Sequence, residues 1–143
     1  MIFEICILAV LIVSAISDIR KKEVPLWEIL GCAAVSAVSA AGAALTGEWD
    51  ILGILISLVP GLVMILISRI SREQIGYGDG LLALASGPAL GIYDLGLGIV
   101  AALFLSGIVS ALLIVFKRAG RRMSIPFVPF MAIGLGVMML AKI

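Results

Sequence analysis

Six long apolar segments, separated by short polar stretches, make up almost the whole chain, and this pattern limits the fold more than any other feature. The segments cover residues 2–17, 26–45, 51–68, 80–93, 95–116 and 124–141. A helix needs about 20 apolar residues to cross a bilayer core of ~30 Å. The protein is 63% hydrophobic and 13% charged, whereas a soluble domain is about a quarter charged. We therefore predict an all-α, polytopic membrane protein: a six-transmembrane-helix bundle in one domain, residues 1–143.

The boundary between the fourth and fifth segments is the least defined. Asp94 is the only charged residue between Gly80 and Phe116. We predict a pair of helices that turns at Tyr93 and Asp94. One long re-entrant element is the alternative.

The basic residues are concentrated in three of the loops. Nine of the ten lysines and arginines follow the first, third and fifth segments: Arg20, Lys21, Lys22, Arg69, Arg72, Lys117, Arg118, Arg121 and Arg122. Six alternating helices place these loops on one side of the membrane. Because basic loops stay in the cytoplasm, we predict a multi-pass protein of the inner (plasma) membrane, with both termini outside and only Lys142 against the trend.

The sequence gives no indication of a metal or cofactor. Cys6 and Cys32 lie in apolar segments, and the chain has no histidine, so a zinc site or a disulfide is not expected. The net charge of +1 does not suggest a nucleic-acid partner. The expected surroundings are the lipid bilayer, and the oligomeric state is left open.

Two acidic residues lie at the ends of apolar segments, where acids are rare and usually functional. Asp18 ends the first segment and Asp79 begins the fourth. These two helices run in opposite directions, so both carboxyl groups should lie at the cytoplasmic boundary. Two alternatives stay open: Asp79 as a helix cap, and Asp18 in an interfacial ion pair with Arg20 or Lys21.

Two neighbouring carboxyl groups are suited to acid–base hydrolysis of a peptide. They share one proton, so the ionised group can take a proton from water while the neutral group donates to the peptide carbonyl. Asp79 is near a helix N-terminus, which favours negative charge, and Asp18 is near a C-terminus. We therefore predict Asp79 as the base and Asp18 as its protonated partner.

Three glycines surround Asp79: Gly76, Gly78 and Gly80. Glycine allows positive φ and close approach of another backbone. We predict that these glycines bind substrate by letting a peptide come within hydrogen-bond distance of the carboxyl group. Glu23 and Glu28 are expected to be solvated or ion-paired.

Three stretches resemble the type IV prepilin peptidase family of membrane aspartyl proteases. The sequence GYGD at 76–79 matches its G-x-G-D motif. Asp18-Ile19-Arg20, followed by Val24-Pro25, resembles the first catalytic segment. Residues 125–130, IPFVPF, resemble the start of the last helix.

The resemblance implies an enzyme that cuts the short basic leader from prepilin-like precursors at the cytoplasmic face, after a glycine, with Asp18 and Asp79 as the catalytic pair. Larger members also methylate the new N-terminus and carry paired cysteines. This chain has no C-x-x-C, so we predict a peptidase-only form similar to those of Tad/Flp-type pili. An archaeal preflagellin peptidase is the alternative, and a small proton-coupled transporter or channel subunit is the rival from another class.

Overall fold

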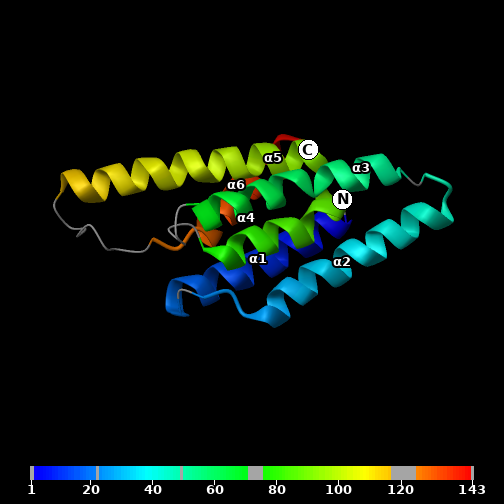
Figure 1. The fold of residues 1–143 in the computed structure, drawn as a ribbon, viewed down its shortest axis with the longest axis horizontal. Coiled ribbons are helices and arrows are strands. Elements are labelled where there is room, and N and C mark those ends of the chain that lie inside the picture. The colour runs from blue at the N-terminus through cyan, green and yellow to red at the C-terminus, as the bar shows by residue number, and fades with distance from the viewer. Residues whose placement is uncertain (1, 22, 49, 71–75, 117–124, 143) are drawn as a thin grey trace.

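Helices account for all the regular structure in the part of the chain that the computed structural model describes, residues 2–21, 23–48, 50–70, 76–116 and 125–142. In order along the chain they are α1 (Ile2–Lys21), α2 (Leu26–Leu45), α3 (Ile51–Ser57), α4 (Val59–Ile70), α5 (Tyr77–Val115) and α6 (Val128–Ala141), as Figure 1 shows. The predicted all-α fold is confirmed.

Within the described residues, four helical stretches are long and apolar enough to cross a membrane. They are α1, α2, the stretch Ile51–Ile70 that joins α3 to α4, and α5, while α6 is a shorter apolar helix. The bounds of α2 agree with the predicted segment. The first and fourth predicted segments are too short, because α1 continues past Asp18 and α5 begins before Asp79.

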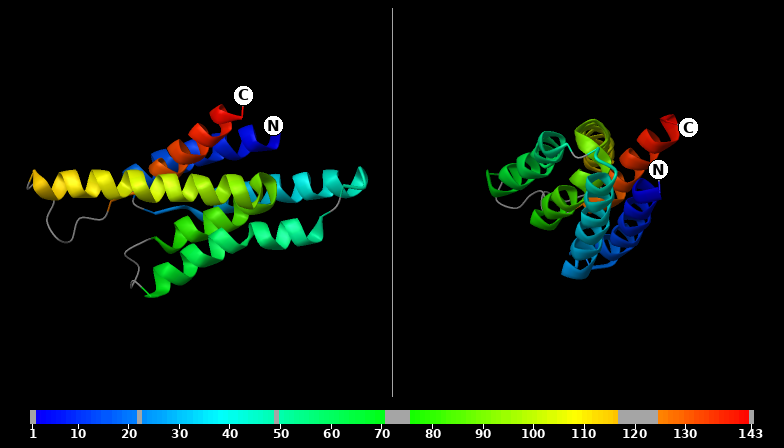
Figure 2. Two further views of the ribbon diagram at one scale, coloured as in Figure 1. Left: turned by 90° about the horizontal axis from the view of Figure 1, so that it is seen from above. Right: turned by 90° about the vertical axis from the view of Figure 1, so that its right-hand side faces the viewer.

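The 39-residue element α5 is two helices separated by a break at Gly91. This glycine has φ 80° and ψ 165°, which is not helical. Figures 1 and 2 show the chain reversing direction there, so that the two parts of α5 run back alongside each other. The predicted turn at Tyr93 and Asp94 is therefore misplaced, since both residues already belong to the helix after the break. The positive φ explains the position, because glycine accepts this conformation without steric cost.

Substitution of Gly91 tests this conformational requirement. A Cβ at Gly91 meets no atom within 4 Å, so alanine there is opposed by the backbone conformation alone. We expect Gly91→Ala to lower the free energy of unfolding by about 1 kcal/mol. Gly96→Ala is the matched control: the site is helical and equally open, so alanine should stabilise it by roughly 0.5–1 kcal/mol. Thermal unfolding in detergent measures both, and equal effects of the two substitutions would contradict the role of Gly91.

The helices approach each other closely through small residues. A Cβ on Gly87 would lie 2.5 Å from the Ser57 carbonyl oxygen, and one on Gly134 would lie 2.4 Å from that of Gly98. Such contacts are typical of helix packing in membranes. Gly87 thus belongs to a packing contact between helices, whereas Gly91 forms the break in α5.

Ser106 and Ser110, two small residues four positions apart in α5, form hydrogen bonds within their own helix. The Ser106 hydroxyl donates to the Leu103 carbonyl oxygen at 3.0 Å, and the Ser110 hydroxyl donates to that of Ser106 at 2.7 Å. Their hydroxyl groups therefore satisfy backbone carbonyls of α5.

Two acidic residues bind the lysine that follows α6, at the end of the bundle where α1 begins and α6 ends. The Lys142 ammonium contacts the carboxylates of Glu4, at 3.4 Å, and of Asp94. The hydrogen bond to Asp94 raises the pKa of Lys142. The one lysine that departs from the predicted charge pattern is thus paired with acids from two other helices.

At the opposite end of the bundle, three basic residues lie in the last turns of α1 and α4: Arg20, Lys21 and Arg69. The remaining predicted cytoplasmic cations lie outside the described residues: Lys22, Arg72, Lys117, Arg118, Arg121 and Arg122.

Candidate active site

Asp18 lies near the C-terminal end of α1 and is only 5% exposed. Its Oδ2 accepts a hydrogen bond of 3.1 Å from the backbone N–H of Val128, 110 positions away in the sequence. Val128 is the first residue of α6, and the first N–H groups of a helix have no partner within it. Asp18 therefore caps α6, and this bond holds the carboxylate in one orientation.

Asp79 is the third residue of α5 and is also 5% exposed. Its carboxylate interacts with the backbone N–H of Gly76, the residue that precedes the helix. An acid at this position commonly reaches back to the start of its helix. The helix-cap alternative considered for Asp79 thus describes a real interaction, and it is compatible with a chemical role because a carboxylate has further lone pairs.

The fold brings Asp18 and Asp79 together. The two carboxyl groups are close enough for the charge of Asp18 to act on Asp79, and both are almost fully buried. An interfacial ion pair would leave Asp18 at the surface, as Arg20 and Lys21 are. A buried pair of interacting carboxyl groups at one end of a helical bundle can share a proton and perform acid–base chemistry.

The sequence suggested that helix dipoles favour the ionised form of Asp79 and disfavour that of Asp18, but in the structure both acids lie near a helix N-terminus. Asp18 lies in the last turns of α1 but also at the N-terminus of α6, through its bond to Val128. Asp79 lies at the N-terminus of α5. Each carboxyl group is thus near a helix N-terminus, where negative charge is favoured. The assignment of Asp79 as base and Asp18 as protonated partner stays a prediction, because helix N-termini favour the ionised form of both acids.

The three glycines around Asp79 lie in different surroundings. Gly76 is exposed, Gly78 is half-buried and Gly80 is buried. A Cβ on Gly78 would lie 3.1 Å from the Val24 Cβ, and one on Gly80 would lie 2.7 Å from the Ile65 Cγ1. At Gly80 the close neighbour is thus helix α4. The positive φ that glycine allows is not used at these three positions, since Gly47 and Gly91 are the glycines that have it in the described residues. Substrate binding by Gly76, Gly78 and Gly80 stays a prediction.

Glu28 is the acidic residue that sequence reasoning misplaced. It is 0% exposed, although a solvated or ion-paired position was expected. Its Oε1 accepts a hydrogen bond of 2.7 Å from the Ser17 hydroxyl, next to Asp18. One signal could have revealed this burial: the buried residues of α2 are Glu28, Cys32 and Ser36, and a spacing of four places them on one face of a helix.

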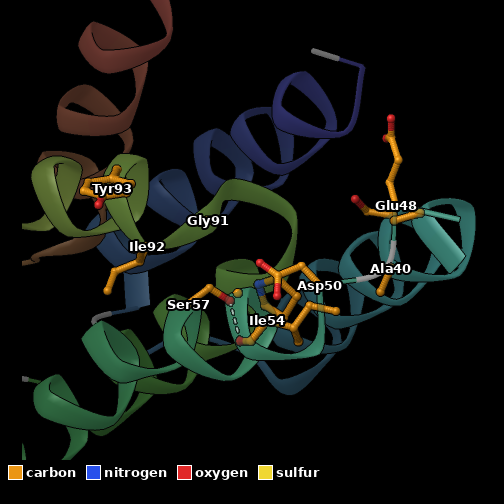
Figure 3. Close-up of a pocket in the computed structure, with 12 residues that line it drawn as sticks. Ala40, Glu48, Asp50, Ile54, Ser57, Gly91, Ile92 and Tyr93 are labelled. Carbon is orange, nitrogen blue, oxygen red and sulfur yellow. Dashed lines mark hydrogen bonds between the residues drawn. The ribbon is translucent and has the colours of Figure 1, made fainter.

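A cavity of about 310 Å³ lies at the other end of the bundle, where α2, α3 and the Gly91 break meet. Figure 3 shows Asp50, Ile54 and Ser57 beside Gly91 there. Glu48 and Tyr93 also line the cavity, but neither Asp18 nor Asp79 does. The candidate chemistry is therefore separate from this cavity.

The described helices are long and apolar enough to fit a multi-pass membrane protein, and two interacting acids are buried at one end of the bundle. These features define the class of protein: a helical bundle with an acidic site at one end. The particular assignment comes from the sequence, because the profile of the type IV leader peptidase family matches residues 5–116. The chain belongs to this family. The matched region includes Asp18 and Asp79 and ends before α6. Neither a comparison with curated proteins nor one with solved structures finds a match.

Proposed function

We propose that the protein is a membrane aspartyl endopeptidase that removes the leader peptide from type IV prepilin-like precursors. Family membership supports a peptidase that acts on leader peptides. The observation that carries the aspartyl mechanism is the burial of Asp18 and Asp79 within electrostatic reach of each other. A transporter that relays protons would need acids at staggered depths, and these two lie at one end.

In the proposed reaction one aspartate takes a proton from water as the water oxygen attacks the scissile carbonyl carbon. The other aspartate donates its proton to the carbonyl oxygen. The C–N bond of the resulting gem-diol intermediate then breaks: the leaving nitrogen takes the proton that the first aspartate removed from water, and the second aspartate regains a proton from a hydroxyl of the intermediate. The bond from the Val128 N–H would keep Asp18 oriented through these steps. Neither a metal nor an organic cofactor enters this reaction.

We further propose that the chain crosses the membrane six times, through α1, α2, α3 with α4, the two parts of α5, and α6. The reversal at Gly91 supports counting α5 as two crossings. The end of the bundle that contains Asp18 and Asp79 also contains basic residues in the last turns of α1 and α4: Arg20, Lys21 and Arg69. The positive-inside rule then puts the active site at the cytoplasmic face. Methylation of the product is not part of the proposal, since the chain lacks paired cysteines.

Cleavage of defined precursors tests this function. We expect the protein, reconstituted in liposomes, to shorten a Flp-type prepilin by the length of its leader, as measured by mass spectrometry. An archaeal preflagellin in a parallel reaction separates the two candidate substrate classes. The matched control is each precursor with the glycine before the cleavage site replaced. If both precursors remain intact, the proposed function is wrong.

A further inference from the structure

A third carboxyl group is buried beside the candidate pair. Glu28, in the first turn of α2, is 0% exposed. An ionisable side chain buried within an apolar helix is rare, and in membrane proteins it usually has a functional role. Glu23, five positions earlier, is exposed, so burial is a property of position 28 and not of this stretch as a whole.

The hydrogen bonding of Glu28 is incomplete. Oε1 accepts the bond from the Ser17 hydroxyl, but Oε2 is buried and has no hydrogen-bond partner among the residues that the structure describes. The same is true of the Ser14 hydroxyl, one turn before Asp18 on α1. A buried polar atom without a partner destabilises a fold. A side chain of similar size without polar atoms would avoid this cost, so packing alone does not explain an acid at this position.

Glu28 acts on Asp18 in two ways. Through the Ser17 bond it connects the first turn of α2 to the residue that precedes Asp18. Its carboxyl group also lies within electrostatic reach of Asp18. The other titratable group that it influences is Cys32 on its own helix, while Asp79, from α5, interacts with Asp18. Asp18 is thus held by Val128 of α6 and lies within electrostatic reach of Glu28 of α2.

We propose that Glu28 is a positioning residue for Asp18, which it places and electrostatically tunes during peptide hydrolysis. This inference rests on the proposed function, because it concerns the same site. Glu28 itself does not exchange a proton with the substrate or with the attacking water.

Two substitutions separate this role from a structural one. Glu28→Gln keeps an oxygen that can accept the Ser17 bond and removes the carboxyl group. Glu28→Met removes both, together with the buried atom that lacks a partner, and Ser17 can then bond to a carbonyl of its own helix. Glu23→Gln is the control, with the same chemical change at an exposed site. For each variant we would measure kcat, KM, the pH dependence of kcat, and thermal unfolding in detergent.

We expect Glu28→Gln and Glu28→Met each to lower kcat about tenfold or more, the size of one lost interaction with a charged group. KM should stay close to the wild-type value and the pH profile should change shape. Glu28→Met should unfold at the wild-type temperature or above. Glu23→Gln should match the wild type throughout.

Two results would overturn the inference. One is wild-type kcat and pH dependence in Glu28→Met or Glu28→Gln. The other is a Glu28→Met protein that does not fold, because the carboxyl group would then serve the structure. Failure of the proposed function looks different: the wild-type protein itself would cleave no precursor.

Discussion

Asp18→Asn and Asp79→Asn should each lower kcat for leader cleavage by at least about 10³-fold, within the range that general acid–base groups contribute. Asparagine has nearly the shape of aspartate but does not exchange protons in this way. At position 18 its side-chain oxygen can still accept the bond from Val128. The loss should therefore be one of chemistry and not of folding. Residues that act as one unit are strongly non-additive, so the double variant should be no slower than the slower single variant.

The measurement is single-turnover cleavage of a prepilin in liposomes, with thermal unfolding of each variant as a test of folding. Asp50→Asn is the charge-matched control, because Asp50 is exposed and precedes α3 at the far end of the bundle. It should cleave at the wild-type rate. Normal cleavage by either Asp18→Asn or Asp79→Asn would exclude the two-aspartate mechanism.

Gly134→Val should cause the largest loss of stability among the glycine substitutions considered. The added Cβ would lie 2.4 Å from the Gly98 carbonyl oxygen and 3.2 Å from the Ala102 nitrogen. Both are backbone atoms of α5, so α6 itself has to move. Overpacking of this kind costs typically 1–3 kcal/mol. Because the N-terminus of α6 donates its Val128 N–H to Asp18, cleavage activity should fall together with stability.

Gly136→Val is the matched control, two positions further along α6. There the nearest atom to the added Cβ is Leu8 Cδ1, at an ordinary 3.8 Å. The intrinsic effect of valine in a helix is the same at both sites, so the difference between the variants reports the contact with α5. Unfolding in mixed micelles gives the two free energies. A similar loss in both variants would show that the close approach of α5 and α6 is not important for stability.

Sequence reasoning was successful where the determining physics is local. The length and apolar character of residues 26–45 define α2, because a helix in lipid satisfies its backbone within itself. Asp18 and Asp79 were expected at one end of the bundle from helix direction alone, and they meet there. The reversal within α5 was predicted, but two or three residues too late. The prediction used the polarity of Tyr93 and Asp94, whereas the turn depends on the backbone conformation of Gly91.

The residues that surround Asp18 and Asp79 could not be predicted from the sequence. The hydrogen bond from Val128 to Asp18 joins residues 110 positions apart, and no local sequence pattern predicts it. Glu28 was expected to be solvated or ion-paired, because glutamate is rarely buried, yet the packing of α1 against α2 buries it. The contact of Gly80 with Ile65 of α4 is likewise not visible in the glycine pattern.

The sequence by itself thus determined that the protein is a bundle of apolar helices, which of its ends is basic, and which two acids stand at the same level. Those properties follow from the lengths of the helices, the positions of the charged residues along the chain and the alternating direction of successive helices. Each of these is available from the sequence alone. Only the tertiary structure decided what surrounds the acids. It placed α6 over Asp18 and Glu28 beside it, because those contacts depend on how helices that are distant in sequence pack through their smallest residues.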